Sequence, residues 1–265
     1  MNLLRKLPLN SINAFKFIRM SQTITIHNNI VPVTAEPNID IQAVIENQNF
    51  EKWYTGLDEN LLVKDIHIQS VDRFGNGKIG FIKFKSTIYR KDIPNSRSIP
   101  GIIFMRGPSV AILIVLKCNN QCYTILTRQA RTAIGSSNFP EIPAGTFDGD
   151  HFKGVASNEL KEEVGLSIEE KDLVDLTKMA YKDNFKGMYP SPGACDEFIK
   201  LYLYEKEISE EELKQYEGKA TGVSTSGEYI TLQVCKLDDV WRITPDSKTL
   251  CSIFLYNQLK MNNEI

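Results

Sequence analysis

Three glutamates within five residues are the feature of this sequence that most constrains its fold and its chemistry. Glu159, Glu162 and Glu163 are three and four positions apart, and residues with that spacing lie on one face of an α-helix. Leu160 and Val164 point away from this face and can anchor the helix in a hydrophobic core. The pattern predicts a helix from about residue 154 to residue 164 that carries an acidic stripe.

Such a stripe is costly unless something neutralises it. Two like charges about 4 Å apart repel by roughly 4 kcal/mol at an effective dielectric constant near 20. One interpretation is an acidic helix face that is solvated, which is common. The other is a metal site, and carboxylate oxygens without a nearby Cys or His suit Mg²⁺ or Mn²⁺ rather than Zn²⁺.

Composition excludes several other classes of protein. The 265 residues carry 31 Lys and Arg against 33 Asp and Glu, a net charge of −2, so no net basic field predicts binding to nucleic acid or to an anionic membrane. The longest strongly apolar run, residues 109–116, is far shorter than the roughly 20 residues that span a bilayer. Five cysteines are sparse and odd in number, which argues against a disulfide scaffold.

Hydrophobic patterning predicts an irregular mixture of strands and helices, which favours an α+β fold over a repeating βαβ architecture. The last helix is expected to place Leu250, Ile253, Phe254 and Leu259 on its apolar side. The expected helices cover about 39–60, 154–164 and 246–260, and the expected strands are 62–74, 78–89, 109–116, 123–128, 199–204 and 229–234.

Two turns are predicted to be hairpins rather than ligand sites. Residues 75–80 match G-x-G-x-x-G, but a strand follows them where a dinucleotide-binding loop needs a helix, so we interpret them as a hairpin. Cys118 and Cys122 flank the turn between 109–116 and 123–128. With no second Cys or His pair at zinc spacing, an ordinary turn is the favoured interpretation.

The N-terminus differs from the rest of the chain. Residues 1–35 contain four Lys and Arg and no acidic residue, which is typical of an organellar transit peptide. The alternative is a disordered tail. The expected location is a mitochondrion or another organelle if this segment is a transit peptide, and the cytoplasm otherwise.

The segment from Gly145 to Leu166 resembles the Nudix box, G-x5-E-x7-R-E-U-x-E-E-x-G-U, where U is an aliphatic residue. Three departures are clear: Asp150 replaces the first Glu, the loop before it is one residue shorter, and Asn158 replaces the Arg. In the family that Arg helps to hold the acidic side chains, so its loss bears on rate and metal affinity more than on reaction type. The matching residues are Gly145, Glu159, Leu160, Glu162, Glu163, Gly165 and Leu166.

Further motifs make the resemblance more specific. Glu-Ile-Pro-Ala-Gly at 141–145 and Ser-Pro-Gly-Ala-Cys-Asp-Glu at 191–197 look like the ADP-sugar diphosphatase branch of the Nudix hydrolases. Residues 74–81, 100–111 and 240–242 are similar to plant-type members of that branch. The resemblance implies Mg²⁺-dependent hydrolysis of the diphosphate bond of ADP-ribose or ADP-glucose to AMP and a sugar phosphate.

The same resemblance, which runs from about residue 65 to the C-terminus, implies a fold. We expect a Nudix α/β/α sandwich with a mixed sheet over residues 106–265, preceded by a small β-rich domain over residues 36–105. In the family such an N-terminal domain pairs two subunits, so a homodimer is expected.

The resemblance also implies which residues bind metal. Glu159 and Glu163 correspond to the principal Mg²⁺ ligands, and the backbone carbonyl of Ala144 is a further candidate ligand. Glu162 lies close by as a candidate catalytic residue, and Mn²⁺ is an alternative ion.

Substrate contacts are expected from two arginines and two glutamates. Arg106 and Arg131 match positions where related hydrolases place substrate-binding arginines, and a guanidinium suits phosphate and ribose oxygens. The alternative for each is a surface salt bridge. Glu141 and Glu197 lie in the family's substrate loops, where each either holds a second metal or a sugar hydroxyl or merely caps a turn.

A hydrolase of this kind needs a general base that reaches the attacking water. In the resembled branch the base comes from a loop after the central helix, and Glu228 follows the Gly- and Ser-rich stretch 218–227, so it is the candidate. The alternative for Glu228 is a solvated residue at a strand edge. The alternative for the whole chain, favoured by Asn158 and the shortened loop, is a Nudix-fold protein that binds a nucleotide sugar with little or no turnover.

Overall fold

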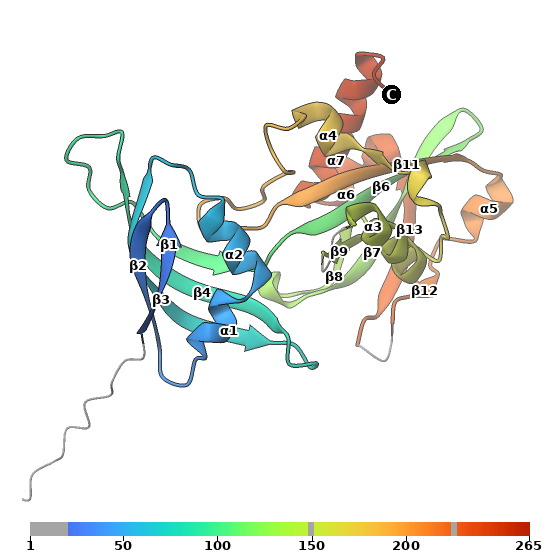
Figure 1. The fold of residues 1–265 in the computed structure, drawn as a ribbon. Coiled ribbons are helices and arrows are strands. Elements are labelled where there is room, and N and C mark those ends of the chain that lie inside the picture. Colours follow the sequence, from blue (N-terminus) through green and yellow to red (C-terminus); the bar gives the residue numbers. More distant parts are fainter. Residues whose placement is uncertain (1–20, 148–150, 224–226) are drawn as a thin grey trace, which may run out of the picture. The chain divides into compact units, whose positions relative to one another are not determined.

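The computed structural model describes residues 21–147, 151–223 and 227–265 of the chain (Figure 1). They divide into two compact units, of which the first ends at Ile102 and the second spans Ile103–Ile265. The division falls inside strand β5 (Ile102–Met105), whereas the sequence placed it after residue 105.

The first unit is a five-stranded sheet in the order β1-β2-β3-β4-β5. Strands β1 and β2 pair antiparallel, as do β3 and β4, whereas β2 and β3 run parallel. The additional strands are β1 (Ser21–Ile26), β2 (Asn29–Ala35), β3 (Leu61–Arg73) and β4 (Ile79–Arg90).

The β1–β2 hairpin corrects the expectation of a transit peptide or disordered tail over residues 1–35. Ile24 and Ile26 on β1 and Val31 and Val33 on β2 are buried at alternate positions, as a half-buried strand requires. Residues 21–35 therefore belong to the folded unit, and the remaining part of the expected tail, residues 1–20, lies outside the described residues.

Two short helices replace the single helix expected over residues 39–60. They are α1 (Ile41–Ile45) and α2 (Gln48–Thr55), and Asn47 separates them because its side chain caps α2 by accepting from two backbone amides. Phe50 and Trp53 of α2 pack edge-on against Phe84 of the sheet. These aromatic residues therefore serve the core of the first unit.

The hairpin predicted at residues 75–80 is confirmed, because it joins β3 to β4. The Phe74 amide donates to the Lys78 carbonyl at 2.9 Å, and the Gly77 amide donates to the Phe74 carbonyl at 2.8 Å. The G-x-G-x-x-G match is thus a strand connection.

The second unit is built on a mixed sheet in the order β10-β11-β6-β7-β13-β12, with β8 paired to β7 and β9 paired to β6. Strands β11 and β6 are parallel and the other pairs are antiparallel. The strands are β6 (Ser109–Cys118), β7 (Gln121–Arg131), β8 (Ser136–Glu141), β9 (Ala144–Thr146), β10 (Val174–Asp175), β11 (Ile199–Glu207), β12 (Ala220–Thr221) and β13 (Ile230–Lys236).

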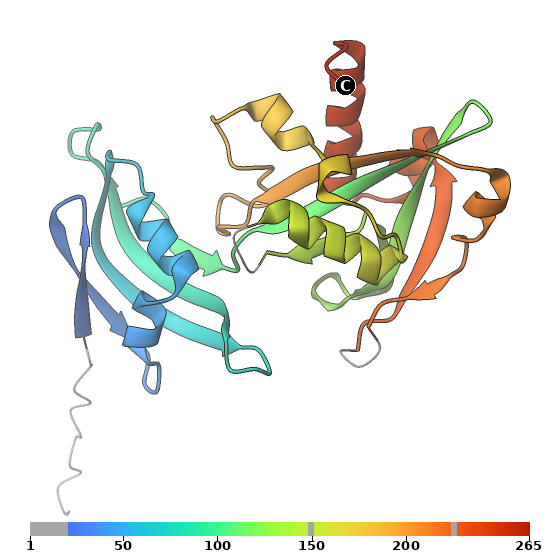
Figure 2. The same ribbon diagram turned by 45° about the vertical axis from the view of Figure 1, so that its right-hand side comes forward.

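Helices cover both faces of this sheet (Figure 2). On β6, Ile112 and Ile114 pack in a core with α3 (Phe152–Glu159), whereas Leu113 and Val115 pack in a second core with α7 (Ser247–Met261). This confirms the expected α/β/α sandwich and explains why β6 is apolar throughout. The other helices are α4 (Leu176–Tyr181), α5 (Glu210–Lys214) and α6 (Val240–Ile243), with a π turn η2 (Leu160–Val164) and 3₁₀ turns η1 (Thr132–Ile134), η3 (Glu170–Asp172) and η5 (Leu237–Asp239).

Helix α7 begins where the sequence places it, and its buried face matches the expected one in part. Asp246 caps the helix. Leu259 is buried as expected and Ile253 packs against the core, whereas Phe254 is 60% exposed. The buried face also includes Thr249 and Ser252, whose hydroxyls bond to carboxylate and backbone groups of neighbouring residues. Polar side chains with such partners are tolerated in a core, and hydrophobic spacing alone does not identify them.

The second hairpin predicted from sequence is confirmed between β6 and β7. Cys118 is an even number of residues from Ile112 and Ile114 and so lies on the same face of the sheet as they do. Cys122 packs in the α7 core on the opposite face. The two side chains therefore lie on opposite faces of the sheet, which agrees with the interpretation as an ordinary turn.

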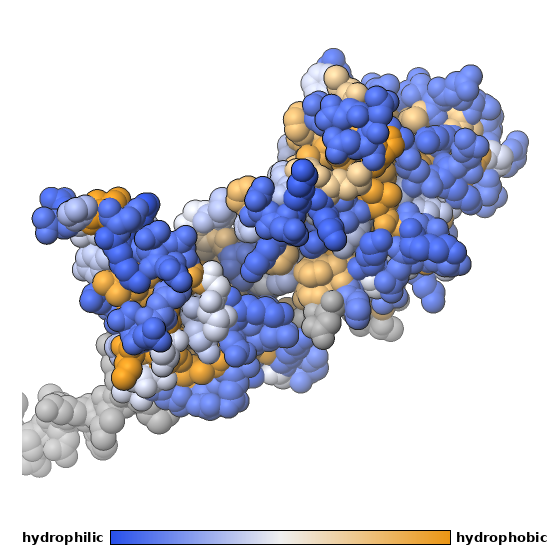
Figure 3. All heavy atoms as spheres, turned by 45° about the horizontal axis from the view of Figure 1, so that its top comes forward, coloured by the Kyte–Doolittle hydropathy of each residue, from blue (hydrophilic) through white to orange (hydrophobic). Residues whose placement is uncertain are grey.

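The molecular surface on the face drawn in Figure 3 is mostly hydrophilic, with hydrophobic residues in smaller patches between. No helix in the described part of the chain is long and apolar enough to cross a membrane.

Candidate active site

The predicted acidic helix is present as α3 followed without a break by the π turn η2, and we use the name acidic helix for residues 152–164. Leu160 and Val164 of this helix are buried in the core with residues of β6, as the sequence predicted. The three carboxylates differ in exposure: Glu162 is exposed, Glu159 is half-buried and Glu163 is only 7% exposed. A fully solvated acidic face is therefore excluded.

Glu163 is held at both carboxylate oxygens. Gln129 Nε2 donates to Oε1 at 3.1 Å, and the Ala144 amide donates to Oε2 at 3.0 Å. Burial raises the pKa of Glu163 to about 8, and the negative charges of Glu159 and Glu141 add to the rise, although the two hydrogen bonds oppose it. Ala144, expected as a ligand, thus lies directly beside Glu163.

Glu159 lies against the backbone of the turn before the acidic helix. A Cβ placed on Gly145 would be 1.7 Å from Glu159 Oε1, so only glycine leaves room for this carboxylate. Burial and the negative charges of Glu162 and Glu228 raise the pKa of Glu159 to about 7. The candidate base Glu228 is therefore close enough for its charge to act on Glu159.

These residues fit a divalent metal ion. Within residues 21–147, 151–223 and 227–265, no three Asp, Glu, His or Cys side chains already converge as a finished metal site. However, Glu159 occupies a hollow that a Cβ would fill, and burial raises the pKa of Glu159 and Glu163, with a further rise from the repulsion between neighbouring carboxylates. A hard cation bound by oxygen ligands would reverse that repulsion, as Mg²⁺ does in carboxylate sites.

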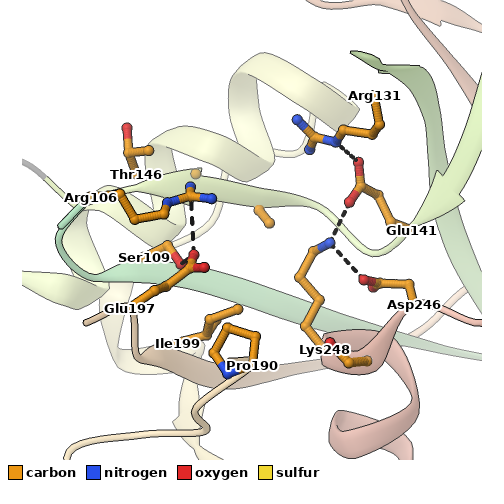
Figure 4. Close-up of a pocket in the computed structure, with 13 residues that line it drawn as sticks. Arg106, Ser109, Arg131, Glu141, Thr146, Pro190, Glu197, Ile199, Asp246 and Lys248 are labelled. Carbon is orange, nitrogen blue, oxygen red and sulfur yellow. Dashed lines mark hydrogen bonds and ion pairs between the residues drawn. The ribbon is translucent and has the colours of Figure 1, made fainter. Parts of the chain in front are cut away.

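A cavity of about 300 Å³ lies in the second unit (Figure 4). All four predicted substrate-binding side chains line it, together with the turn that carries Ala144 and Gly145. Strands β6, β7, β8 and β9 and the start of α7 supply most of its walls. The lining residues are Arg106, Ser109, Arg131, Glu141, Ala144, Gly145, Thr146, Pro190, Glu197, Ile199, Asp246, Ser247 and Lys248.

Arg106 and Glu197 face each other on one side of the cavity. Arg106 Nη2 is 3.5 Å from Glu197 Oε1, and Ser109 Oγ donates to the same oxygen at 2.8 Å. Arg106 Nε is buried and has no hydrogen-bond partner among the described residues. Asp196 fixes the backbone here by accepting from the Arg106 amide at 2.8 Å. The guanidinium thus retains an unused donor.

Glu141 is the centre of a second ionic cluster, shown on the right of Figure 4. Arg131 Nε is 2.5 Å from Glu141 Oε1, and Lys248 Nζ contacts both Glu141 Oε2 and, at 3.0 Å, Asp246 Oδ1. Glu141 and Lys248 are buried. The cluster thus joins a buried ion pair to Arg131, whose side chain is 41% exposed.

The sequence analysis missed Gln129, Asp246 and Lys248. Gln129 is one ordinary strand residue, and its bond to Glu163 exists only because β7 lies beside the acidic helix. Asp246 carried a usable signal, since it precedes a helix as a cap does. Lys248 reaches the cavity only through the packing of α7, which no local pattern reveals. The departure at Asp150 lies outside the described residues.

Comparison with known proteins agrees with the motifs. The sequence matches the model of the NUDIX domain over residues 105–250. Nudix hydrolase 14, chloroplastic, of Arabidopsis thaliana is 37% identical over 253 residues, which cover 89% of this chain and 81% of the relative. A structure titled "Crystal structure of ADP compounds hydrolase" aligns with a TM-score of 0.48 at 15% identity, covering 78% of this chain and 98% of the other. The two sequence matches show that this chain belongs to the Nudix hydrolase family.

Proposed function

We propose that this chain hydrolyses the diphosphate bond of an ADP-sugar to give AMP and a sugar phosphate. The observation that supports this most directly is the cavity, whose walls combine Arg106, Arg131 and Lys248 with the turn beside Glu163. Cationic side chains in a cavity that adjoins the carboxylates of the acidic helix suit a diphosphate bound next to a divalent ion.

The arginines are suited to different parts of such a substrate. Arg106 lines the cavity with its side chain 34% exposed, and a guanidinium gains a charge-assisted hydrogen bond when a phosphate oxygen arrives. Arg131 is already bonded to Glu141, which fixes the direction of the remaining donors of its guanidinium. We assign both arginines to substrate binding, and Glu141 and Glu197 to holding them or a sugar hydroxyl.

Glu159 and Glu163, with the Ala144 carbonyl, would hold Mg²⁺, and Mn²⁺ is an alternative. When bound, the ion would neutralise phosphate charge and polarise phosphorus. Glu228 would accept a proton from the attacking water, whose oxygen forms the new bond to phosphorus as the bridging P–O bond breaks. Glu162 is exposed near Glu159 and is assigned a supporting catalytic role.

The proposal extends to assembly and location. We propose a homodimer, which size-exclusion chromatography with light scattering tests. The similar plant protein is described as chloroplastic, and residues 1–20 contain no acidic residue, so we propose delivery to an organelle. A reporter fused to residues 1–20 should enter an organelle, whereas a uniformly cytosolic reporter would contradict this.

The decisive experiment offers the purified chain ADP-ribose, ADP-glucose, a nucleoside triphosphate and a dinucleotide, each with and without Mg²⁺. AMP and a sugar phosphate are expected from one or both ADP-sugars, and only with metal. Cleavage of the triphosphate alone would reject the ADP-sugar assignment. Tight ADP-sugar binding without AMP release, in Mg²⁺ or Mn²⁺, would favour a binding protein, which the replacement of the family's Arg by Asn158 also favours.

A further inference from the structure

A hydroxyl from a distant strand holds the end of the acidic helix. Thr221 Oγ1, on β12, donates to the backbone carbonyl of Glu163 at 2.6 Å, although 58 residues separate them. Carbonyl groups in the last turn of a helix have no partner within the helix. Thr221 therefore supplies a bond that the helix itself does not, at the residue whose carboxylate faces the metal site.

This contact completes the fixation of Glu163. Its carboxylate oxygens accept from Gln129 on β7 and from the Ala144 amide on β9, while its carbonyl accepts from Thr221. The position of the carboxylate thus depends on three separate strands. Of these, only β12 leads directly into the segment that ends at Glu228.

Thr221 is also tied to Glu228 through the backbone. Gly222 follows with φ of +88°, and a Cβ on it would be 2.7 Å from the Glu228 carbonyl oxygen. The Glu228 amide donates to the Val223 carbonyl at 3.3 Å, and Thr221 pairs with Ile230 across β12 and β13. The backbone of Glu228 and that of Ile230 therefore lie against Thr221, Gly222 and Val223.

We infer that Thr221 is a positioning residue that fixes Glu228 and the acidic helix relative to each other. Its hydroxyl keeps the candidate base and the metal-facing carboxylate of Glu163 at a constant separation. The inference rests on the proposed function for its kinetic consequence, but its effect on metal binding and on the helix end does not require the substrate to be known.

The test compares Thr221→Val, which keeps the shape and removes the hydroxyl, with Thr221→Ser, which keeps the hydroxyl. Thr221→Ala serves in place of the valine variant if that protein does not fold. Thr34→Val is the matched control, because Thr34 Oγ1 also donates to a backbone carbonyl, that of Ile66 at 3.4 Å, in the first unit. The measurements are kcat and KM for an ADP-sugar, the dissociation constant for Mn²⁺ without substrate, and hydrogen exchange over residues 160–166.

Loss of the hydroxyl should lower kcat by about 10-fold and raise the Mn²⁺ dissociation constant by a similar factor, as loss of a group that orients metal ligands does. KM should change little, hydrogen exchange should become faster over residues 160–166, and Thr221→Ser should restore kcat, Mn²⁺ affinity and exchange. Wild-type kcat, Mn²⁺ affinity and exchange in a folded Thr221→Val or Thr221→Ala protein would overturn the inference. If no ADP-sugar is cleaved by the wild type, the proposed function fails, while Mn²⁺ affinity and exchange still decide the role of Thr221.

Discussion

Glu159 and Gly145 are in such close contact that a single methyl group on Gly145 would lie 1.7 Å from the Glu159 carboxylate oxygen. The contact joins the turn that lines the cavity to the acidic helix. Position 145 has room only for glycine, because the Glu159 carboxylate occupies the volume that any side chain would need. The position of Glu159 is thus set by the backbone opposite as much as by its own helix.

The first prediction replaces Gly145 with Ala. The new methyl group must displace Glu159, and displacement of a reacting group by about 1 Å costs on the order of 100-fold in rate. We expect metal-dependent turnover to fall by about that factor while circular dichroism stays unchanged. Gly75→Ala is the control, because a Cβ at Gly75 meets nothing within 4 Å. Equal activity of the two variants would show that Glu159 is not needed where it lies.

The second prediction concerns Glu163→Gln. The amide keeps the size of the side chain but removes one anionic ligand from a hard cation, so turnover should fall more than about 10-fold and Mg²⁺ affinity should weaken. Glu211→Gln, on exposed α5, controls for the loss of one negative charge. A folded Glu163→Gln protein with wild-type turnover would remove Glu163 from the metal site.

The third prediction is a pH dependence of the metal-free protein. Folding raises the pKa of Glu163 to about 8 and that of Glu159 to about 7, from a reference value of 4.5. These two groups therefore contribute stability fully below pH 4.5, and they lose it as the pH rises toward 8. Thermal unfolding in EDTA measures the Tm of the wild type and of Glu163→Gln. As the pH rises from 5 to 8, the Tm of the variant should rise relative to that of the wild type. A difference that stays constant over this range would contradict the burial of an uncompensated carboxyl.

The sequence predicted secondary structure and buried faces correctly where the spacing of hydrophobic residues matches the side of the element that is buried. Residues 109–116 are buried on both faces of the sheet, and the helix predicted over 154–164 has its aliphatic residues in the core. The cavity side chains Arg106 and Arg131 were identified through motifs, since no local pattern distinguishes a cavity arginine from a surface one. That they share one cavity follows only from the pairing of β7 with β8 and the position of β6.

The expectations that failed are of two kinds. Some depended on contacts with residues distant in the sequence, and others gave composition more weight than a local hydrophobic pattern. The buried face of α7 was assigned by apolar residues, but Thr249 is buried because the Ile142 amide donates to its hydroxyl. The β1–β2 hairpin is a case of the second kind. Ile24 and Ile26 are apolar at alternate positions, as in a strand, but the absence of acidic residues favoured a transit peptide or a disordered tail. The π turn at the end of the acidic helix has no propensity signal that separates it from an α-helix.

The fourth prediction tests the cluster around Glu141, which buries Lys248 between two carboxylates. Lys248→Met would leave the buried carboxylate of Glu141 without one of its two cationic partners, and breaking a buried ion pair costs up to about 3–5 kcal/mol. The exposed Lys214, 3.6 Å from Glu210, is the control, because Lys214→Met should cost about 1 kcal/mol or less.

Urea denaturation followed by circular dichroism measures both free energies of unfolding. The double variant Lys248→Met, Glu141→Gln should recover part of the loss, because it removes the charge that the single variant leaves without its ammonium partner. Glu141→Gln also removes the carboxylate partner of Arg131, so this single variant is measured as well, and the complete cycle gives the coupling between Lys248 and Glu141. If Lys248→Met and Lys214→Met destabilise the protein equally, the Lys248 ammonium is solvated rather than held between Glu141 and Asp246.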